Sequence, residues 1–291
     1  MVLAAGLGTR LRPLTDLRAK PLVPIGDRPA LLHVLERLAR AGLAPRAVNV
    51  HHRAEDVADA AARAGALVSR EDELLGTAGG VARALPLLGA GDVLVWNGDI
   101  VADVDPAALV RAHRAAATLL VRGLPAGEGN VGVAADNAVV RLRGETCAPG
   151  EASGGEFLAI HVLGAQLARS LPARGCLVGD AYLPALRRGA RIEAVLTRAA
   201  FRDVGTIASY VAANVDWLAS RGLGAWRADG AIVDPRVELR DSVVGAGARV
   251  EGAGALERVV VWPGAVARAP LRDAVVTEAG AVPIPPRATT T

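Results

Sequence analysis

The sequence predicts an α/β protein with a doubly wound, mostly parallel sheet, followed by a short C-terminal parallel β-helix. Three observations support this fold class. Short apolar runs alternate with amphipathic helical stretches through the first part of the chain, which is typical of βα units. Residues 93–96 form an apolar run of the kind buried on both faces by helices. From about Ile232 the helical stripes disappear, and apolar residues recur at every sixth position instead.

The individual elements follow in order from the periodicity of apolar residues. Strands are expected at residues 2–5, 47–50, 66–68 and 93–96. Helices are expected at residues 29–41, 55–64 and 79–88, the first of them closed by Gly42. Ligands of such sheets bind beyond the carboxyl ends of the strands, so the loop that follows residues 2–5 is a candidate site.

The C-terminal part combines six-residue spacing with glycine at turns, which is typical of a parallel β-helix. The apolar residues six apart are Val244, Val250 and Leu256, then Val260 and Val266, then Val276 and Val282. The alternative is a small Gly/Ala-rich β appendage without true coils. The predicted organisation is therefore a first domain at 1–222, a linker at 223–230, the β-helix-like domain at 231–282 and a disordered tail at 283–291.

Composition excludes several classes of function. Hydrophobic residues make up 52% of the chain but aromatic residues only 3%, which argues against binding single-stranded nucleic acid by stacking. The net charge is +3, and acidic and basic residues are interspersed, so no nucleic-acid partner is expected. No uncharged apolar run could span a membrane, and the two cysteines form no C-x-x-C pair. A cytoplasmic protein is expected, although the sequence leaves open whether Met1 is the true start.

Cations gather after the glycine loop at residues 6–9. The loop is neither a Walker loop nor a dinucleotide fingerprint, because the required Gly-Lys and third glycine are missing. Arg10, Arg12 and Lys20 follow it closely, and Lys20 is the single lysine among 33 basic residues. A compact ammonium is not replaced well by a planar guanidinium, so this lysine is a candidate for direct contact with phosphate. Three cations beside a glycine loop suit a triphosphate better than a simple turn.

Residues 3–15 (LAAGLGTRLRPLT) and 20–24 (KPLVP) resemble the opening signature of the sugar-1-phosphate nucleotidyltransferases. Three later segments match the same family in order, namely 75–80 (LGTAGG), 97–99 (NGD) and 201–206 (FRDVGT). The pattern is closest to the mannose-1-phosphate guanylyltransferases. The resemblance implies a Rossmann-like nucleotidyltransferase domain and, at the C-terminus, the hexapeptide repeats of a left-handed β-helix.

The resemblance also implies roles for particular residues. Arg10 and Lys20 would be catalytic, holding the phosphates, while Asp99 and Asp203 would bind Mg²⁺, the expected cofactor. The residues implied to line the nucleotide are Leu3, Ala4, Ala5, Gly6, Gly8, Thr9, Gly76, Thr77, Ala78 and Gly79. The residues implied to line the sugar are Asn130, Gly132, Glu156 and Ala159.

The chain departs from the family at two places on the sugar side. The Glu-Lys-Pro of many members is absent, and residues 141–146 read RLRGET instead. Arg141 and Arg143 are interpreted as a solvated face, with Arg143 or another arginine a substitute for the missing lysine. Ala159 stands where the family often has glycine.

The expected reaction joins a nucleoside triphosphate to a sugar 1-phosphate and releases pyrophosphate. GTP with mannose 1-phosphate is the first choice, because residues 75–79 resemble the guanylyl and uridylyl branches. Uridylyl transfer to glucose, N-acetylglucosamine or N-acetylmuramic acid 1-phosphate is the alternative. A non-catalytic regulatory subunit that binds nucleotide sugars is the alternative from another class. Self-association through the exposed edges of the C-terminal domain is a further expectation.

Overall fold

In the computed structural model, which describes residues 1–285, the chain forms two compact units. The first, here called the sheet unit, comprises Met1–Gly6 and Leu31–Phe201. The second, here called the coil unit, comprises Leu7–Ala30 and the chain from Arg202 onward. Of the predicted tail 283–291, residues 286–291 lie outside the described part. The domain boundaries read from the sequence stay a prediction.

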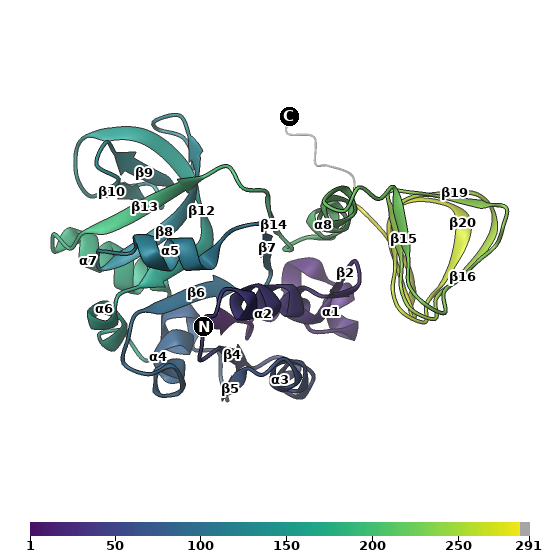
Figure 1. Cartoon of the computed structure of the whole chain (residues 1–291), viewed down its shortest axis with the longest axis horizontal. Helices are drawn as coiled ribbons and strands as arrows, with labels where there is room; N and C mark the ends of the chain where they lie inside the picture. Colours follow the sequence, from purple (N-terminus) through teal and green to yellow (C-terminus); the bar gives the residue numbers. More distant parts are fainter. Residues whose placement is uncertain (286–291) are drawn as a thin grey trace. The chain divides into compact units, whose positions relative to one another are not determined.

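The sheet unit confirms the α/β fold (Figure 1). Strand β1 (Val2–Leu3) runs parallel to both of its neighbours, β4 (Ala47–Val50) and β6 (Val93–Asn97). Beyond β4 lies β5 (Leu67–Arg70), also parallel. The helices between these strands are α2 (Ala30–Arg40), α3 (Ala54–Arg63) and α4 (Gly76–Leu88). All the carboxyl ends of these four strands therefore meet at one edge, where the predicted nucleotide segments begin.

The remaining strands make the sheet mixed, so the prediction of a mostly parallel sheet is wrong for this half. The long strand β12 (Glu151–Leu163) pairs antiparallel with β6, β8 and β9. The strands involved are β8 (Ala117–Leu124), β9 (Val131–Ala134), β10 (Val139–Leu142), β11 (Glu145–Thr146) and β13 (Ile192–Thr197). The other elements here are β7 (Ile100–Ala102), α5 (Pro106–Ala112), α6 (Ala165–Arg169), the π-helical turn Leu177–Tyr182, α7 (Leu183–Arg187) and β14 (Phe201–Asp203). The βα alternation thus covers only the first hundred residues or so.

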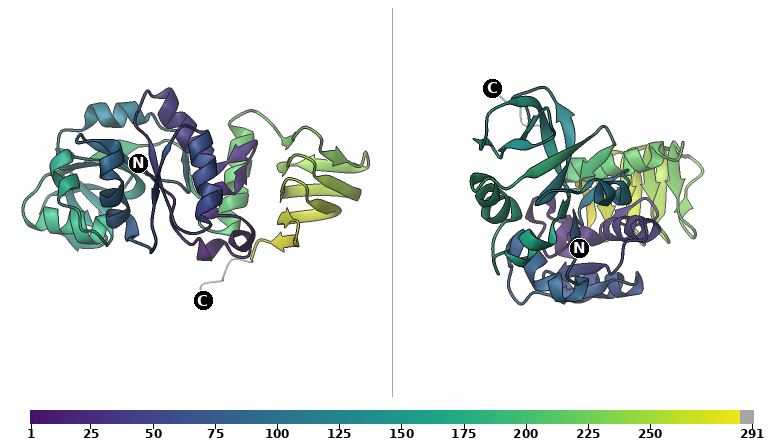
Figure 2. Two further views of the ribbon diagram at one scale, coloured as in Figure 1. Left: turned by 90° about the horizontal axis from the view of Figure 1, so that it is seen from below. Right: turned by 60° about the vertical axis from the view of Figure 1, so that its left-hand side comes forward.

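The coil unit contains the C-terminal strands, stacked mainly in parallel (Figure 2). Its strands are β15 (Ala225–Arg227), β16 (Ile232–Val233), β17 (Val237–Arg240), β18 (Ser242–Val244), β19 (Arg249–Val261), β20 (Val266–Thr277) and β21 (Gly280–Pro283). Trp226, Val243, Val260 and Val275 lie in register on successive strands, and Figure 1 shows the coils with a three-sided outline. Strand β21 turns back antiparallel on β20 and ends the stack. These parallel registers favour stacked coils over the predicted alternative of an appendage without them.

One of the residues expected to face inward does not. Val266 pairs with Arg249 on the outer face and is 49% exposed, whereas the next residue, Ala267, pairs with Val250 and is buried. Val244, Val250 and the other predicted positions up to Leu256 are buried as expected. The six-residue count is wrong at Val266 because it starts from Val260, whereas Val244 pairs with Val261, and the sixth residue after Val261 is the buried Ala267. A count that starts one residue early places every following side chain on the opposite face.

The rest of the coil unit comes from both ends of the chain. It holds the 3-10 turn Thr9–Leu11, α1 (Leu14–Leu17), the 3-10 turn Lys20–Leu22, the hairpin of β2 (Pro24–Ile25) and β3 (Arg28–Pro29), and α8 (Ile207–Ala219). Part of the predicted signature therefore packs with the C-terminal coils rather than with β1. A prediction that divides the sequence into consecutive domains cannot place this part of the signature in the same unit as the C-terminal coils.

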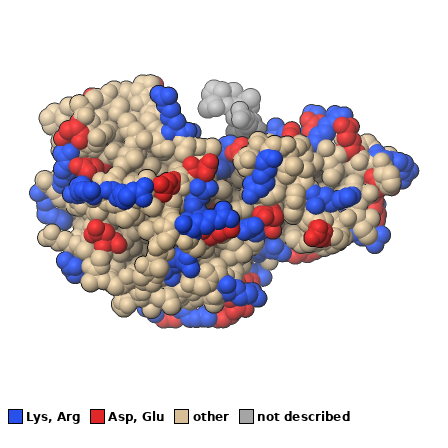
Figure 3. Space-filling view, in the orientation of Figure 1, with Lys and Arg blue, Asp and Glu red and all other residues tan. Residues whose placement is uncertain are grey.

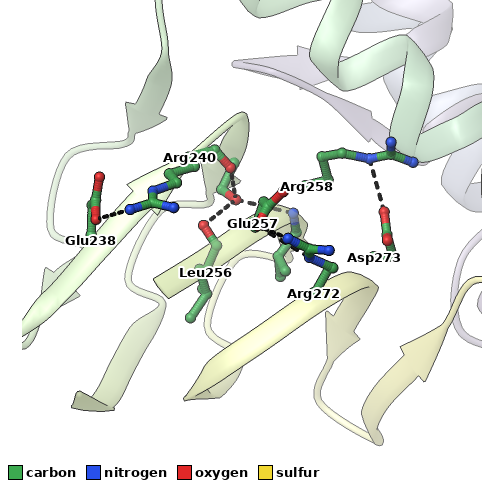
Figure 4. A network of polar contacts seen from close by, with 9 residues as sticks. Glu238, Arg240, Leu256, Glu257, Arg258, Arg272 and Asp273 are labelled. Carbon is green, nitrogen blue, oxygen red and sulfur yellow. Dashed lines mark hydrogen bonds and ion pairs between the residues drawn. The ribbon is translucent and has the colours of Figure 1, made fainter. Parts of the chain in front are cut away.

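Ion pairs cover the outside of the coils. Figure 4 shows the pairs Glu238–Arg240, Glu257–Arg272 and Arg258–Asp273. Figure 3 shows acidic and basic side chains interspersed on the face in view, as the composition indicates. Such exposed pairs each contribute about 0–1 kcal/mol, so the buried apolar stack stabilises the coils more than they do. Within residues 1–285, no helix has both the length and the apolar character needed to cross a bilayer.

Candidate active site

The carboxylate of Asp203 lies beside two cations of the signature. Lys20 Nζ is 3.9 Å from Asp203 Oδ1, and Arg10 Nη2 is 3.9 Å from Asp203 Oδ2. All three residues belong to the coil unit, although Asp203 lies far from the other two in the sequence. The fold therefore brings together three of the four charges that the sequence predicted to act together.

The side chains of the two cations differ in their exposure to solvent. The Lys20 side chain is 12% exposed, whereas Arg10 is 68% exposed. Gly8 adopts a left-handed conformation (φ 65°), and a Cβ there would lie 2.9 Å from Lys20 Cβ and 2.8 Å from Thr15 Cγ2. Thr15 Oγ1 also donates a hydrogen bond to the Gly8 carbonyl at 3.0 Å. The glycine loop thus packs directly against the stem of Lys20, which narrows the positions its ammonium can take.

A glycine that the sequence analysis missed makes room for the Arg10 and Asp203 pair. A Cβ at Gly205 would lie 3.0 Å from Asp203 Oδ1 and 3.1 Å from Arg10 Nη2. The next residue, Thr206, caps α8, its hydroxyl accepting from Ser209 N at 3.1 Å. The Asp-Val-Gly-Thr sequence therefore presents a carboxylate, leaves space beside it and then starts a helix. The signal was visible in the matched segment 201–206, but only the aspartate was singled out.

Asp99 lies at the carboxyl end of β6, in the sheet unit. The preceding Gly98 donates its N–H to the Leu3 carbonyl at 2.8 Å, and a Cβ on it would lie 3.1 Å from the same oxygen. A side chain at position 98 would crowd β1, so the close approach of this turn to the strand favours glycine. It holds Asp99 next to the end of the strand that leads into the glycine loop, as predicted for a residue on the ligand edge.

The donor chemistry fits a magnesium ion that arrives with its substrate. Among residues 1–285, no three His, Cys, Asp or Glu side chains gather into a site that could hold a metal. Mg²⁺ typically uses one or two protein carboxylates and takes its other ligands from phosphates and water. Asp99 in the sheet unit and Asp203 in the coil unit each offer a hard oxygen donor of the kind that this mode of binding uses.

A buried polar network, also missed by the sequence analysis, supports the predicted nucleotide segments. Ala4 N donates to Asn49 Oδ1 at 2.7 Å, Asn49 Nδ2 donates to Glu71 Oε1 at 2.7 Å, and Leu75 N donates to Glu71 Oε2 at 3.1 Å. Asn49 and Glu71 are 3% and 5% exposed. The network joins the end of β1 to the start of residues 75–80. Its sequence signal was the asparagine inside an otherwise apolar strand, since a buried amide needs partners.

Residues 76–79 start α4 earlier than the predicted residue 79 because another loop supports them. Ala78 N donates to the Gly175 carbonyl at 2.9 Å, and Leu177 N donates to Thr77 Oγ1 at 2.8 Å. A Cβ at Gly76 would lie 2.3 Å from Gly175 O, and one at Gly79 would lie 2.4 Å from Ala173 O. Close packing on this backbone explains both glycines. Their contact with a nucleotide stays a prediction.

The predicted sugar-side residues come from neighbouring strands of the sheet unit. Asn130 Oδ1 accepts from Phe157 N at 2.9 Å, and Glu156 forms an ion pair with Arg122. Ala159 has φ 54°, a left-handed conformation that glycine adopts without strain. The departure noted in the sequence therefore falls at a position where the backbone favours the family's usual residue.

Arg141 is not on a solvated face, so that interpretation is wrong. Its guanidinium donates to both oxygens of Glu151 at 2.9 Å, and the two side chains are only 12% and 21% exposed. These bonds, with a further one from Gly127 N, lower the pKa of Glu151 to about 2. The Glu151 carboxylate also fills the space where a Cβ of Gly132 would lie, at 2.2 Å. Arg143, by contrast, is exposed as expected.

Comparisons with known proteins agree with this picture. The nucleotidyl transferase family matches residues 1–128. A mannose-1-phosphate guanylyltransferase of Mycobacterium tuberculosis is 30% identical over 300 aligned positions, which cover 91% of this chain and 82% of that protein. An N-acetylmuramate α-1-phosphate uridylyltransferase of Neisseria meningitidis is 40% identical over 111 residues, or 36% of this chain. The chain spans about half the length of that relative (48%).

The fold also matches solved structures. The crystal structure of HddC from Yersinia pseudotuberculosis complexed with GMP-PN superimposes with a TM-score of 0.62 at 22% identity. The match covers 74% of this chain and 97% of HddC. At this identity the likeness extends to the fold alone.

Proposed function

The chain belongs to the family of sugar-1-phosphate nucleotidyltransferases, and from this premise we propose that it transfers a nucleotidyl group from a nucleoside triphosphate to a sugar 1-phosphate. The observation that carries the proposal is the position of Asp203 within 3.9 Å of both Lys20 and Arg10. A carboxylate that keeps two cations in place, at distances longer than a close ion pair, suits a site where phosphate oxygens supply the nearer partners.

The proposed reaction is an in-line displacement. A phosphate oxygen of the sugar 1-phosphate forms a bond to the α-phosphorus, and the bond from that phosphorus to the bridging oxygen of the β-phosphate breaks, releasing pyrophosphate. The attacking phosphate is already ionised, so no protein base is needed. The confined Lys20 is assigned to the oxygens around the α-phosphorus, where position matters most. The exposed Arg10 is assigned to the leaving β- and γ-phosphates.

We assign Asp99 and Asp203 as the protein ligands of Mg²⁺. Bound there, the ion would neutralise negative charge on the phosphates of the triphosphate. Asp203 also orients the two cations, because its carboxylate lies 3.9 Å from both Lys20 Nζ and Arg10 Nη2.

The nucleotide and sugar positions complete the assignment. The base and ribose are assigned to residues 3–6 and 76–79, which the Asn49 and Glu71 network ties together. The sugar is assigned to Asn130, Gly132, Glu156 and Ala159. Arg141 is held by Glu151, so the arginine assigned to replace the family's missing lysine is the exposed Arg143 or Arg122, which pairs with the sugar-side Glu156.

GTP and mannose 1-phosphate are the proposed substrates. The match to the mycobacterial guanylyltransferase runs over 91% of the chain and so includes the C-terminal coils. Uridylyl transfer is the second candidate, because the identity to the N-acetylmuramate enzyme is higher, at 40%, over the N-terminal 36% of the chain. The two candidates differ in both base and sugar, so one assay separates them.

The organisation of the chain forms part of the proposal. We take the coils at 231–282 as a left-handed parallel β-helix, supported by stacked registers such as Val243 with Val260. The proposed boundaries are a catalytic domain at 1–222 and a linker at 223–230, although β15 (Ala225–Arg227) within that linker already pairs with β18 of the coils. The first coil leaves β16 and β17 paired only with β19, and this free edge is where two copies would associate.

Pyrophosphate release, measured for each nucleoside triphosphate against a panel of sugar 1-phosphates, tests the function. We expect the highest kcat/KM with GTP and mannose 1-phosphate, and loss of turnover when EDTA removes Mg²⁺. UTP with N-acetylmuramate 1-phosphate as the best pair would favour the second candidate. Binding of nucleotide sugars without turnover of any pair would favour the non-catalytic regulatory alternative.

Two matched variants test the site. Asp203→Asn should lower kcat by about 100-fold or more, since it removes a charge at the reacting phosphates. Asp234→Asn is the control in the same unit, because Asp234 pairs with Arg236 on the outside of the coils, and it should keep kcat within about twofold. Normal turnover by Asp203→Asn would contradict the assignment of this carboxylate.

A further inference from the structure

One face of α8 holds the turn that follows Lys20. Tyr210, Asn214 and Trp217 lie on this face, at helical spacing. The Tyr210 hydroxyl donates to the Pro24 carbonyl at 2.7 Å, and Gly26 N donates to Asn214 Oδ1 at 2.9 Å. The Trp217 ring packs so closely on Gly26 that a Cβ there would lie 2.0 Å from it. Asn214 Nδ2 also donates to the Pro24 carbonyl, at 3.5 Å. The turn is therefore fixed to the helix by three hydrogen bonds and a close aromatic contact.

A short rigid segment connects this turn to Lys20. Leu22 N donates to the Ala19 carbonyl at 2.8 Å and Val23 N to the Lys20 carbonyl at 3.3 Å, which closes a 3-10 turn around the lysine. Ala30 N donates to the Val23 carbonyl at 3.1 Å and closes the following hairpin. Pro21, with its fixed φ, lies inside this turn, and Leu22 and Val23 both take part in these bonds, so we expect a shift of Pro24 to move the lysine backbone with it.

The C-terminal coils contact α8 at the same tyrosine. Trp262, at the end of β19, donates its indole N–H to the Tyr210 hydroxyl at 3.0 Å, and both side chains are fully buried. Trp262 N is itself bonded to the Val276 carbonyl at 2.8 Å, which places the residue within the stack of coils. Arg18, two residues before Lys20, lies over the Trp262 ring with Cζ 4.9 Å from its centroid.

The direction of these hydrogen bonds is determined by chemistry. An indole N–H can only donate and a proline carbonyl can only accept, so the Tyr210 hydroxyl must accept from Trp262 and give its single proton to Pro24. Burial raises the pKa of Tyr210, which keeps that proton in place. The donors and acceptors are therefore fixed: Trp262 of the coils donates to Tyr210 of α8, and Tyr210 donates to Pro24, in the segment that carries Lys20.

We propose that Tyr210 and Trp262 are positioning residues for Lys20, so that the C-terminal coils set the place of the lysine in the active site. The expected effect on turnover rests on the proposed function, whereas the expected effect on the position of Lys20 does not. Asp203 lies just before α8, so one helix holds both the carboxylate and, through Tyr210, the cation that faces it. The coils would then contribute to turnover without touching a substrate.

The single lysine makes the proposal testable without any turnover. The rate at which an acylating reagent labels Lys20, followed by mass spectrometry of its peptide, reports the accessibility of one known amine. Tyr210→Phe removes the proton donated to Pro24, and Trp262→Phe removes the donor to Tyr210 while keeping a ring. We expect both to raise the labelling rate at least threefold. Tyr182→Phe is the matched control, because this tyrosine is also fully buried but its hydroxyl has no partner within residues 1–285. It should leave the rate unchanged.

Kinetics supply the second readout. Tyr210→Phe should lower kcat about tenfold, with KM for both substrates within twofold, since a displaced Lys20 weakens contacts of the transition state more than those of bound substrate. In a Lys20→Arg background the same change should cause no further fall, because Tyr210 acts only through the lysine. A full tenfold fall in that background would show a general structural role and overturn the proposal.

The proposed function and the positioning of Lys20 by Tyr210 and Trp262 can be refuted independently of each other. If the wild type turns over no substrate pair but Tyr210→Phe and Trp262→Phe still raise the labelling of Lys20, the proposed function is wrong and the positioning stands. If Tyr210→Phe keeps both the labelling rate and kcat of an active wild type, the positioning is refuted. If Tyr210→Phe does not fold, Trp262→Phe decides by the same criteria.

Discussion

Replacing Glu71 by glutamine should destabilise the sheet unit although the new side chain has nearly the same shape. The two carboxylate oxygens of Glu71 accept from two donors, Asn49 Nδ2 and Leu75 N. Asn49 cannot turn its amide round, because its Oδ1 accepts from Ala4 N. A glutamine amide has one oxygen and one NH₂ group, so in either orientation a donor faces a donor.

The cost follows from the burial of the network. Glu71 and Asn49 are 5% and 3% exposed, so water does not replace the lost acceptor. Loss of one hydrogen bond to a charged group, with a donor left unsatisfied, costs about 2–4 kcal/mol. For a chain of this size that corresponds to a fall in Tm of about 5–15 °C. Asn49→Asp alone should cost a similar amount, because it places a second carboxylate against Glu71.

Combining Asn49→Asp with Glu71→Gln should restore most of the lost stability. The new carboxylate can accept from both Ala4 N and the new amide, whose oxygen accepts from Leu75 N, so every donor again has an acceptor. Thermal unfolding of the two single variants and the double variant measures the coupling directly. If the double variant loses the sum of the two single losses, the network does not act as described.

Three further predictions follow from the geometry. Lys20→Arg should lower kcat for pyrophosphate release at least about 100-fold although the charge is kept, because the glycine loop confines the lysine stem. A kcat above half that of wild type would contradict the assignment of Lys20 to the α-phosphate oxygens. Glu151→Gln should destabilise the chain in urea at pH 7, because the pKa of Glu151 is lowered from 4.5 in the unfolded chain to about 2 in the folded one. The contribution of the carboxylate is complete above pH 4.5 and is lost progressively as pH falls to about 2, so the difference between wild type and variant should shrink over this range. An equal difference at pH 7 and pH 2 would show that the charge on Glu151 does not stabilise its pairing with Arg141. Ala159→Gly should leave Tm unchanged or raise it by a few degrees. Glycine removes the strain of the left-handed conformation, about 1–2 kcal/mol, and this gain equals or exceeds the loss from the greater conformational entropy of the unfolded chain. A marked fall in Tm would mean that packing of the alanine methyl group stabilises the folded chain.

Local patterns were enough to predict much of this protein. The βα alternation of the first hundred residues, the β-coils and the signature around Lys20 could all be read from residues close together in sequence. The antiparallel half of the sheet could not, since strand direction depends on which partners a strand such as β12 finds. Val266 was misplaced because the sequence does not show that Val261, and not Val260, is the residue in register with Val244, and a start one residue early reverses the faces of the strand that follows.

The sequence by itself determined the kinds of groups available: a glycine loop, a single lysine, two aspartates in glycine turns and a family resemblance that joins them. Only the tertiary structure decided which groups meet. Spacing along the chain does not report that Lys20 lies beside Asp203, that Arg141 is held by Glu151, or that Asn49 and Glu71 join two strand ends. Electrostatic and hydrogen-bond energies depend on distances of a few ångströms in space, and those distances are set by the packing of the whole chain.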